Sequence, residues 1–115
     1  MEDRRKLKRK SLMIYSRVFD LQTTKLVGHL VNITPEGAML ISETPVPGGQ
    51  DYRLKMELSP DVADVPYLEF EARSLWCQPD VNPQFYNTGF RFLSIAPESI
   101  AIVQKIVEAY RFRDN

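Results

Sequence analysis

The chain has 115 residues, of which 43% are hydrophobic and 26% charged, values typical of one soluble globular domain. Fifteen basic and fifteen acidic residues cancel, so the protein as a whole is not built to trap polyanions. The single cysteine, Cys77, and the single histidine, His29, exclude an intramolecular disulfide and a Cys/His zinc cluster. The charged start lacks the apolar segment of a secretory signal, and no apolar run approaches the ~20 residues of a membrane span. We therefore expect a cytoplasmic protein.

The first element along the chain is a basic arm. Residues 4–10 carry six positive charges and no acid, whereas residues 11–115 hold nine basic and thirteen acidic side chains. Such a run either attracts a specific anion or remains a solvated tail. The change in composition predicts an arm over residues 1–10 and a single domain over residues 11–115.

Six short strands are predicted after the arm. The prediction rests on branched and aromatic residues, on alternation of polar and apolar positions, and on turn residues between the runs. Their ranges are 11–19, 25–33, 38–42, 53–58, 67–77 and 85–93. After Pro97, apolar residues recur at three- and four-residue steps, which predicts an amphipathic helix over 97–112. Six strands and one C-terminal helix indicate a mainly-β sandwich or small barrel.

Two arginines of the arm, Arg5 and Arg9, are four residues apart. In an extended chain both point the same way, while Lys6, Lys8 and Lys10 point the other way. A guanidinium fork donates two hydrogen bonds to guanine O6 and N7, stacks on bases and pairs with phosphate. The arm therefore suits an anionic ligand that carries guanine.

The segment Asn32–Gly37 is a polar turn between two predicted strands. Pro35 fits the second position of a type I turn and Gly37 the fourth. Asn32 and Thr34 are two residues apart, so a strand end would present the amide and the hydroxyl on one face. The alternative interpretation is a turn that binds no ligand.

The arm and the turn together resemble the PilZ domain family, whose members bind the bacterial second messenger cyclic di-GMP. The family signature is Arg-x-x-x-Arg in an N-terminal arm, followed by Asp/Asn-x-Ser-x-x-Gly at a strand turn. Here the first motif reads Arg5-Lys6-Leu7-Lys8-Arg9 and the second reads Asn32-Ile33-Thr34-Pro35-Glu36-Gly37. Segments 74–76 and 88–92 are similar to the family's closing strands, so the resemblance covers most of the chain.

The resemblance implies a six-stranded antiparallel β-barrel with a C-terminal helix, and an arm that wraps over cyclic di-GMP on the barrel surface. By the family pattern, Arg5 and Arg9 would hold guanine and phosphate. The turn residues Asn32, Thr34 and Gly37 would contact the other base face and edge. Thr34 departs from the usual serine: its hydroxyl is retained, but the extra methyl group takes space beside the ligand. Further candidates for the site are Arg4, Lys8 and Arg91.

The leading hypothesis is a receptor or adaptor that binds cyclic di-GMP, orders its arm and thereby signals to an unidentified effector protein. The alternative is a PilZ-like interaction module of motility or secretion systems with weak or no nucleotide binding. The acidic body argues against nucleic acid as the ligand. We expect no enzyme activity, metal or cofactor, because there is no phosphate-binding glycine loop and no nucleophile–base pair. Trp76 is interpreted as a core residue, with a position beside the ligand as the alternative.

Overall fold

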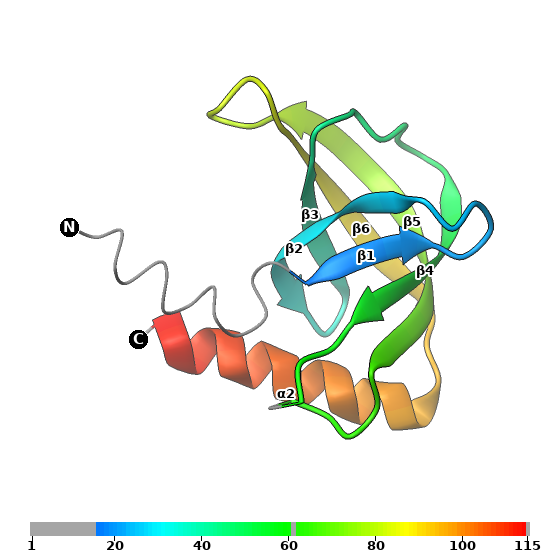
Figure 1. Cartoon of the computed structure of the whole chain (residues 1–115), viewed down its shortest axis with the longest axis vertical. Helices are drawn as coiled ribbons and strands as arrows, with labels where there is room; N and C mark the ends of the chain where they lie inside the picture. Colours follow the sequence, from blue (N-terminus) through cyan, green and yellow to red (C-terminus); the bar gives the residue numbers. More distant parts are fainter. Residues whose placement is uncertain (1–15, 61, 115) are drawn as a thin grey trace.

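The described part of the protein contains six strands and one helix, and the strands close into an antiparallel barrel (Figure 1). The computed structural model describes residues 16–60 and 62–114, with side chains up to Glu108. The elements are β1 Arg17–Asp20, β2 Leu26–Thr34, β3 Gly37–Ser42, β4 Asp51–Glu57, β5 Tyr67–Pro79, β6 Tyr86–Ser94 and α2 Pro97–Asp114. Around the barrel the strands follow the order β1-β2-β3-β6-β5-β4. The six-stranded barrel with a C-terminal helix is therefore confirmed.

The barrel interior is filled from alternate residues of each strand. On β5, Leu68, Phe70, Ala72 and Ser74 are buried, as their spacing predicts, and the residues between them are exposed. Other strands contribute the core residues Val18, Leu30, Ile33, Leu40, Leu54, Met56 and Phe90. Each strand thus has a buried face and a solvent face, and a site on the outer wall must use the residues between core positions.

The helix α2 covers one end of the barrel (Figure 1). It begins at Pro97, as predicted, and Glu98 in its first turn suits the positive end of the helix dipole. The helix contacts β2 and β5 and buries Val103 and Ile106. Ile100 lies three residues before Val103 in the same apolar pattern but is 43% exposed, so it does not belong to the buried face of the helix. Among the described residues, no helix combines the length and the apolar character needed to cross a membrane.

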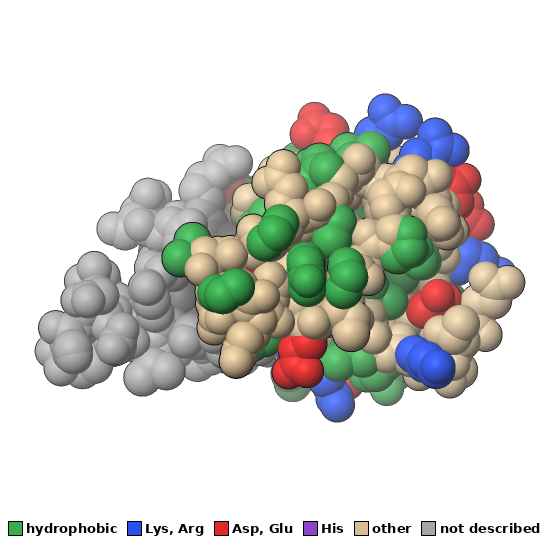
Figure 2. All heavy atoms as spheres, turned by 90° about the horizontal axis from the view of Figure 1, so that it is seen from above, with side chains coloured by type: hydrophobic (Ala, Val, Ile, Leu, Met, Phe, Trp, Pro, Cys, Tyr) green, Lys and Arg blue, Asp and Glu red, His purple; other side chains and the backbone are tan. Residues whose placement is uncertain are grey.

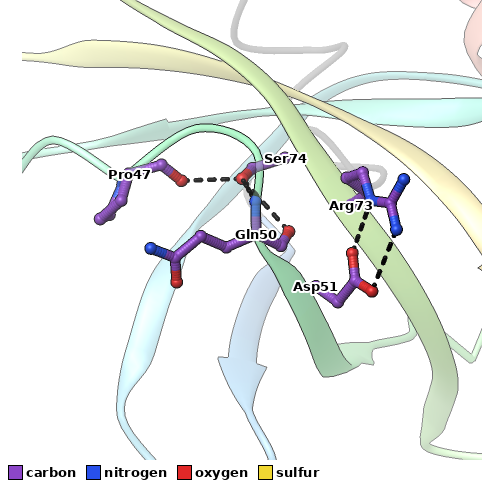
Figure 3. Close-up of polar contacts among 5 residues, drawn as sticks. All are labelled: Pro47, Gln50, Asp51, Arg73 and Ser74. Atoms are coloured by element: carbon purple, nitrogen blue, oxygen red, sulfur yellow. Dashed lines mark hydrogen bonds and ion pairs between the residues drawn. The ribbon is translucent and has the colours of Figure 1, made fainter.

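At the opposite end of the barrel, the loop between β3 and β4 is attached to β5 by one buried serine (Figure 3). The Ser74 hydroxyl donates to the carbonyl oxygen of Pro47 at 2.7 Å and accepts the amide hydrogen of Gln50 at 3.1 Å. Beside it, Arg73 makes a two-point ion pair with Asp51 at 2.6 and 3.2 Å, and these hydrogen bonds lower the pKa of Asp51. The loop is therefore held against the barrel although it has no regular secondary structure.

A second buried hydroxyl, that of Thr88, has no hydrogen-bond partner among the described residues. Leaving such a group unsatisfied costs about 1–3 kcal/mol. We predict that Thr88→Val raises the free energy of unfolding by about 1 kcal/mol and the melting temperature by about 4 °C, measured by urea and thermal denaturation. The matched change Ser74→Ala removes a satisfied hydroxyl and is expected to lower both quantities. A less stable Thr88→Val protein would mean that a buried water satisfies the hydroxyl.

Candidate functional site

The Asn32–Gly37 turn joins β2 to β3 as a tight hairpin. Thr34 pairs with Gly37 across the hairpin, and Pro35 and Glu36 form the connection. The Thr34 hydroxyl oxygen accepts the amide hydrogens of Glu36 and Gly37, both at 3.2 Å. These bonds stabilise the turn itself, so the hydroxyl that the sequence motif offers to a ligand is already engaged with backbone.

Gly37 is buried at the point where β3 pairs with β6, opposite Arg91. A Cβ atom at this position would overlap the carbonyl oxygen of Phe90 and lie 3.1 Å from the Cα of Arg91. Next to it, the amide of Phe92 donates to the carbonyl of Glu36 at 2.8 Å. The glycine therefore allows the close approach of two backbones.

Asn32 lies on the outer wall of β2, next to a β-bulge. The register between β2 and β3 shifts between Leu30 and Asn32, and the following residue, Ile33, is buried. Asn32 and Thr34 are both exposed, so they share one face as predicted. The Asn32 Oδ1 accepts the amide hydrogen of Ile33 at 2.9 Å, while its Nδ2 forms no hydrogen bond to a described residue. The amide nitrogen is thus available as a donor.

A hollow of about 340 Å³ opens between this turn and the strands β5 and β6. The residues that give it chemical character are Asn32, Thr34, Glu36, Trp76, Gly89 and Arg91. An amide, an indole, a guanidinium and the Glu36 carboxylate thus line one recess on the outer wall. This combination suits a ligand that has both an aromatic ring and a negative charge.

Arg91 supplies the positive charge of the hollow. It pairs with Gly37 on β3 and with Arg73 on β5. Arg73 is occupied by its ion pair with Asp51, whereas Arg91 makes no ion pair within the described part of the chain. Arg91 is also exposed. This further candidate from the sequence therefore lies beside the turn with its guanidinium available to an anion.

Trp76 is not a core residue; it is 40% exposed and forms a wall of the hollow. The bulge between Ser74 and Trp76 makes Leu75 an extra residue and shifts the side chains that follow. Trp76 pairs with Gly89, and a Cβ atom on Gly89 would lie 2.5 Å from the indole ring. The ring therefore covers Gly89. Local alternation cannot reveal the bulge, so the prediction of a core position is wrong. Trp76 instead lies in the hollow beside the turn.

The predicted arm residues Arg4, Arg5, Lys8 and Arg9 lie outside the described residues. The described chain begins at Ser16, whose carbonyl oxygen accepts the amide hydrogen of Leu30 at 2.9 Å. Leu30 precedes Asn32 on β2, the strand that ends in the turn. The chain that follows the arm therefore joins the barrel beside the strand that carries the motif.

Among the described residues, no three His, Cys, Asp or Glu side chains are grouped so that they could hold a metal ion. Cys77 is half-buried, and its sulfur accepts the amide hydrogen of Val46 at 3.4 Å. This contact gives the single cysteine a structural role in holding the β3–β4 loop.

Comparison with known proteins gives one family and a set of similar folds. The family model described as the PilZ domain matches residues 3–109. No curated protein matches the chain. Among solved structures, the Bacillus subtilis inhibitor of motility, MotI/DgrA, has a TM-score of 0.71 at 13% sequence identity, covering 88% of this chain and 48% of that one. The chain thus spans about half the length of that protein.

Two further similar structures contain cyclic di-GMP. The PilZ domain of YcgR from Escherichia coli has a TM-score of 0.62 at 16% identity, with 87% of this chain and 83% of that chain covered. PlzA from Borreliella burgdorferi has a TM-score of 0.53 at 16% identity, with 98% of this chain and 50% of that chain covered. At these identities the likeness is one of fold.

Proposed function

The chain belongs to the PilZ domain family, and on this premise we propose that it is a receptor that binds cyclic di-GMP in the hollow beside the Asn32–Gly37 turn. The YcgR PilZ domain and PlzA were both solved with this ligand. We further propose that binding orders the basic arm and that an effector protein recognises the ordered form. A ligand shifts such an equilibrium only by its different affinities for the two states, and ordering of a charged arm supplies that difference.

The observation that carries the proposal is the convergence of three separate strands on one recess. The end of β2 contributes the amide nitrogen of Asn32 and β6 contributes Arg91, neither of which is paired with another described residue, and β5 contributes the exposed ring of Trp76. A guanine base can stack on the indole and accept from the amide, while a phosphate can pair with the guanidinium. Cyclic di-GMP offers all of these groups in one molecule.

The arginines of the arm are within reach of this recess. Arg9 precedes Ser16 by seven residues, which corresponds to roughly 25 Å of fully extended chain. Arg5 precedes Ser16 by eleven residues, or roughly 38 Å. Because Ser16 lies beside β2, both arginines can close over a ligand in the hollow. Their forks would then hold guanine and phosphate from the open side.

A second candidate function is a PilZ-like interaction module with weak or no nucleotide binding. The observation in its favour is the Thr34 hydroxyl, which accepts two amide hydrogens within the turn. A turn that is satisfied by its own side chain is stable without any ligand. In this case the barrel would act through a protein partner alone.

Calorimetric titration separates these functions. We expect saturable binding of cyclic di-GMP and poor binding of cyclic di-AMP, because adenine presents an amino donor where guanine presents the O6 acceptor. A short DNA duplex serves as the control for general phosphate attraction, which falls steeply with salt. If cyclic di-GMP gives no heat with a protein whose circular dichroism is intact, the interaction module is favoured. If cyclic di-AMP binds equally well, the site recognises charge rather than guanine.

We predict that Asn32→Ala weakens cyclic di-GMP binding roughly tenfold, because it removes one hydrogen bond between the protein and the bound ligand. The substitution leaves the two hydrogen bonds of Thr34 in place, so the turn and the melting temperature are expected to persist. Thr34→Ser keeps the hydroxyl and removes one methyl group, and we expect it to bind like the parent chain. Calorimetry of both variants provides the measurement. Parent-like affinity of Asn32→Ala would mean that the turn does not contact the ligand.

A further inference from the structure

The end of the barrel opposite α2 presents an apolar surface to solvent. It is formed by the β3–β4 loop and the β5–β6 hairpin, and we call it the proline-rich end. Its members are Pro45, Pro47, Pro79, Val81, Pro83 and Phe85. Val81 is 100% exposed. Figure 2, which is seen from this end, shows hydrophobic side chains gathered in the middle of the face and charged side chains toward its margin.

The hairpin that carries Val81 is held in one conformation by side-chain hydrogen bonds. Asp80 accepts the amide hydrogen of Asn82 at 3.1 Å and the side-chain amide of Asn87 at 2.8 Å. Asn82 in turn accepts the amide hydrogen of Gln84 at 3.0 Å. The neighbouring loop is fixed by the buried serine shown in Figure 3. A surface that is ordered before binding loses little conformational entropy when a partner docks.

The two loops of the proline-rich end carry only acidic charges, although Figure 2 shows both basic and acidic side chains at the margin of the face. Residues 42–50 and 74–90 contain no lysine or arginine, but they contain Glu43 and Asp80. The hydrogen bond from Asn87, with smaller contributions from backbone amides, lowers the pKa of Asp80 and so favours its charged form. A complementary surface is therefore apolar with lysine or arginine on its rim.

A groove of about 310 Å³ beside the hairpin adds a recess to this surface. It extends from Phe85 and Glu43 to Leu26 and Ile41 on the outer wall of β2 and β3. Leu26 is 47% exposed, so the groove floor is partly apolar and open. Binding energy in interfaces concentrates where one large side chain fills such a recess. The end thus combines a projecting residue, Val81, with a groove beside it.

We propose that the proline-rich end docks a segment of a second protein, which inserts an apolar side chain into the groove and places lysine or arginine beside Glu43 and Asp80. The charges favour this occupant. Two copies of the chain that met symmetrically through this end would bring like carboxylates together. An anionic membrane would meet two carboxylates and no cation within these loops. The proposal goes beyond the receptor function, because it does not depend on nucleotide binding.

The test uses random short peptides displayed on phage and selected on the immobilised full-length chain. We expect the selected peptides to combine an aliphatic or aromatic residue with lysine or arginine. Synthetic copies are then titrated by fluorescence polarisation. Val81→Asn is expected to weaken binding roughly tenfold, the effect of losing one aliphatic side chain from an interface. Glu43→Lys is also expected to weaken peptide binding. Added salt is expected to weaken peptide binding to the parent chain.

Val65→Asn is the matched control, because Val65 is a valine with 46% exposure in the β4–β5 loop, outside this surface. It is expected to leave peptide affinity unchanged. The proposal fails if no peptide is selected, if the peptides lack cations, or if Val81→Asn binds them like the parent. If sedimentation velocity shows a dimer that Val81→Asn abolishes, the surface binds a second copy of the chain and the proposal is overturned. If the chain sediments with phosphatidylglycerol vesicles and Val81→Asn abolishes this, the surface binds membranes and the proposal is also overturned.

Discussion

Replacing Gly37 by alanine is expected to destabilise the barrel by about 3 kcal/mol, the upper range for an overpacked interior. The new Cβ atom would overlap the carbonyl oxygen of Phe90 and lie 3.1 Å from the Cα of Arg91. Both neighbours are backbone atoms, so no side-chain rotation relieves the overlap, and β3 has to move away from β6. The melting temperature is expected to fall by about 12 °C, which differential scanning calorimetry measures directly.

The matched control for this change is Gly48→Ala in the β3–β4 loop. The nearest atoms to a Cβ there are 3.8 Å away on Leu75 and 4.0 Å away on Trp76, which is ordinary contact. Only Gly49, and not Gly48, has a positive φ among the described glycines. Gly48→Ala is therefore expected to leave stability unchanged or to raise it slightly. Equal melting temperatures for the two variants would mean that the barrel accommodates a side chain at Gly37 without strain.

The same backbone contact affects the interpretation of any loss of ligand binding in Gly37→Ala. Gly37 pairs with Arg91, and separation of β3 from β6 would move Arg91 away from Asn32. Loss of cyclic di-GMP binding in Gly37→Ala would therefore be an effect on the framework of the site. It would not show that the glycine contacts the ligand.

Combining Arg5→Ala with Arg9→Ala is expected to weaken cyclic di-GMP binding about a hundredfold or more and to leave the melting temperature unchanged. Each charge-assisted hydrogen bond contributes about 1.5–3 kcal/mol, or roughly tenfold to a hundredfold in affinity. Among the described residues the first member of the core is Val18, after both arginines, so the described core contacts do not depend on them. Calorimetric titration gives the affinity, and thermal denaturation of the unliganded variant gives the stability.

The matched control for the arginines is Lys6→Ala combined with Lys10→Ala, which removes the same number of charges from the same arm. A lysine offers a point charge without the planar fork, and an exposed charge pair contributes at most about 1 kcal/mol, or roughly fivefold in affinity. Similar losses in both double variants would show that the arm attracts anions by charge alone. A lower melting temperature in the arginine variant would show that these residues stabilise the barrel.

The strands and the helix were predictable because their signals are local. Alternation of Leu68, Phe70 and Ala72 with exposed residues identifies the inward face of β5 within a few positions. Pro97 and the change of period identify the start of α2 in the same way. The hairpin at Pro35 follows from the turn preferences of a short segment. None of these features needs knowledge of a distant partner.

The candidate site was predictable only in part. Asn32 and Thr34 share one face, as their spacing requires, because β2 alternates regularly from Asn32, after its bulge, up to the turn. Arg91 was a looser candidate, and its position beside Gly37 depends on the pairing of β3 with β6. Trp76 was assigned to the core, with a position beside the ligand only as the alternative, because a bulge at Leu75 reverses the alternation that local reasoning assumes.

Local sequence patterns were sufficient to predict the mainly-β class, the C-terminal helix and the Asn32–Gly37 turn, and they suggest an anion-binding role for the basic arm. The tertiary structure decided the strand order, and with it which side chains meet. Closure in the order β1-β2-β3-β6-β5-β4 places Arg91 and Trp76 beside the turn and makes Gly37 a point of backbone contact. The same closure leaves the Thr88 hydroxyl without a partner among the described residues and exposes Val81 on the β5–β6 hairpin. The physical reason is that side-chain alternation repeats every two residues along one strand, whereas register and bulges are set by hydrogen bonds between strands far apart in the chain.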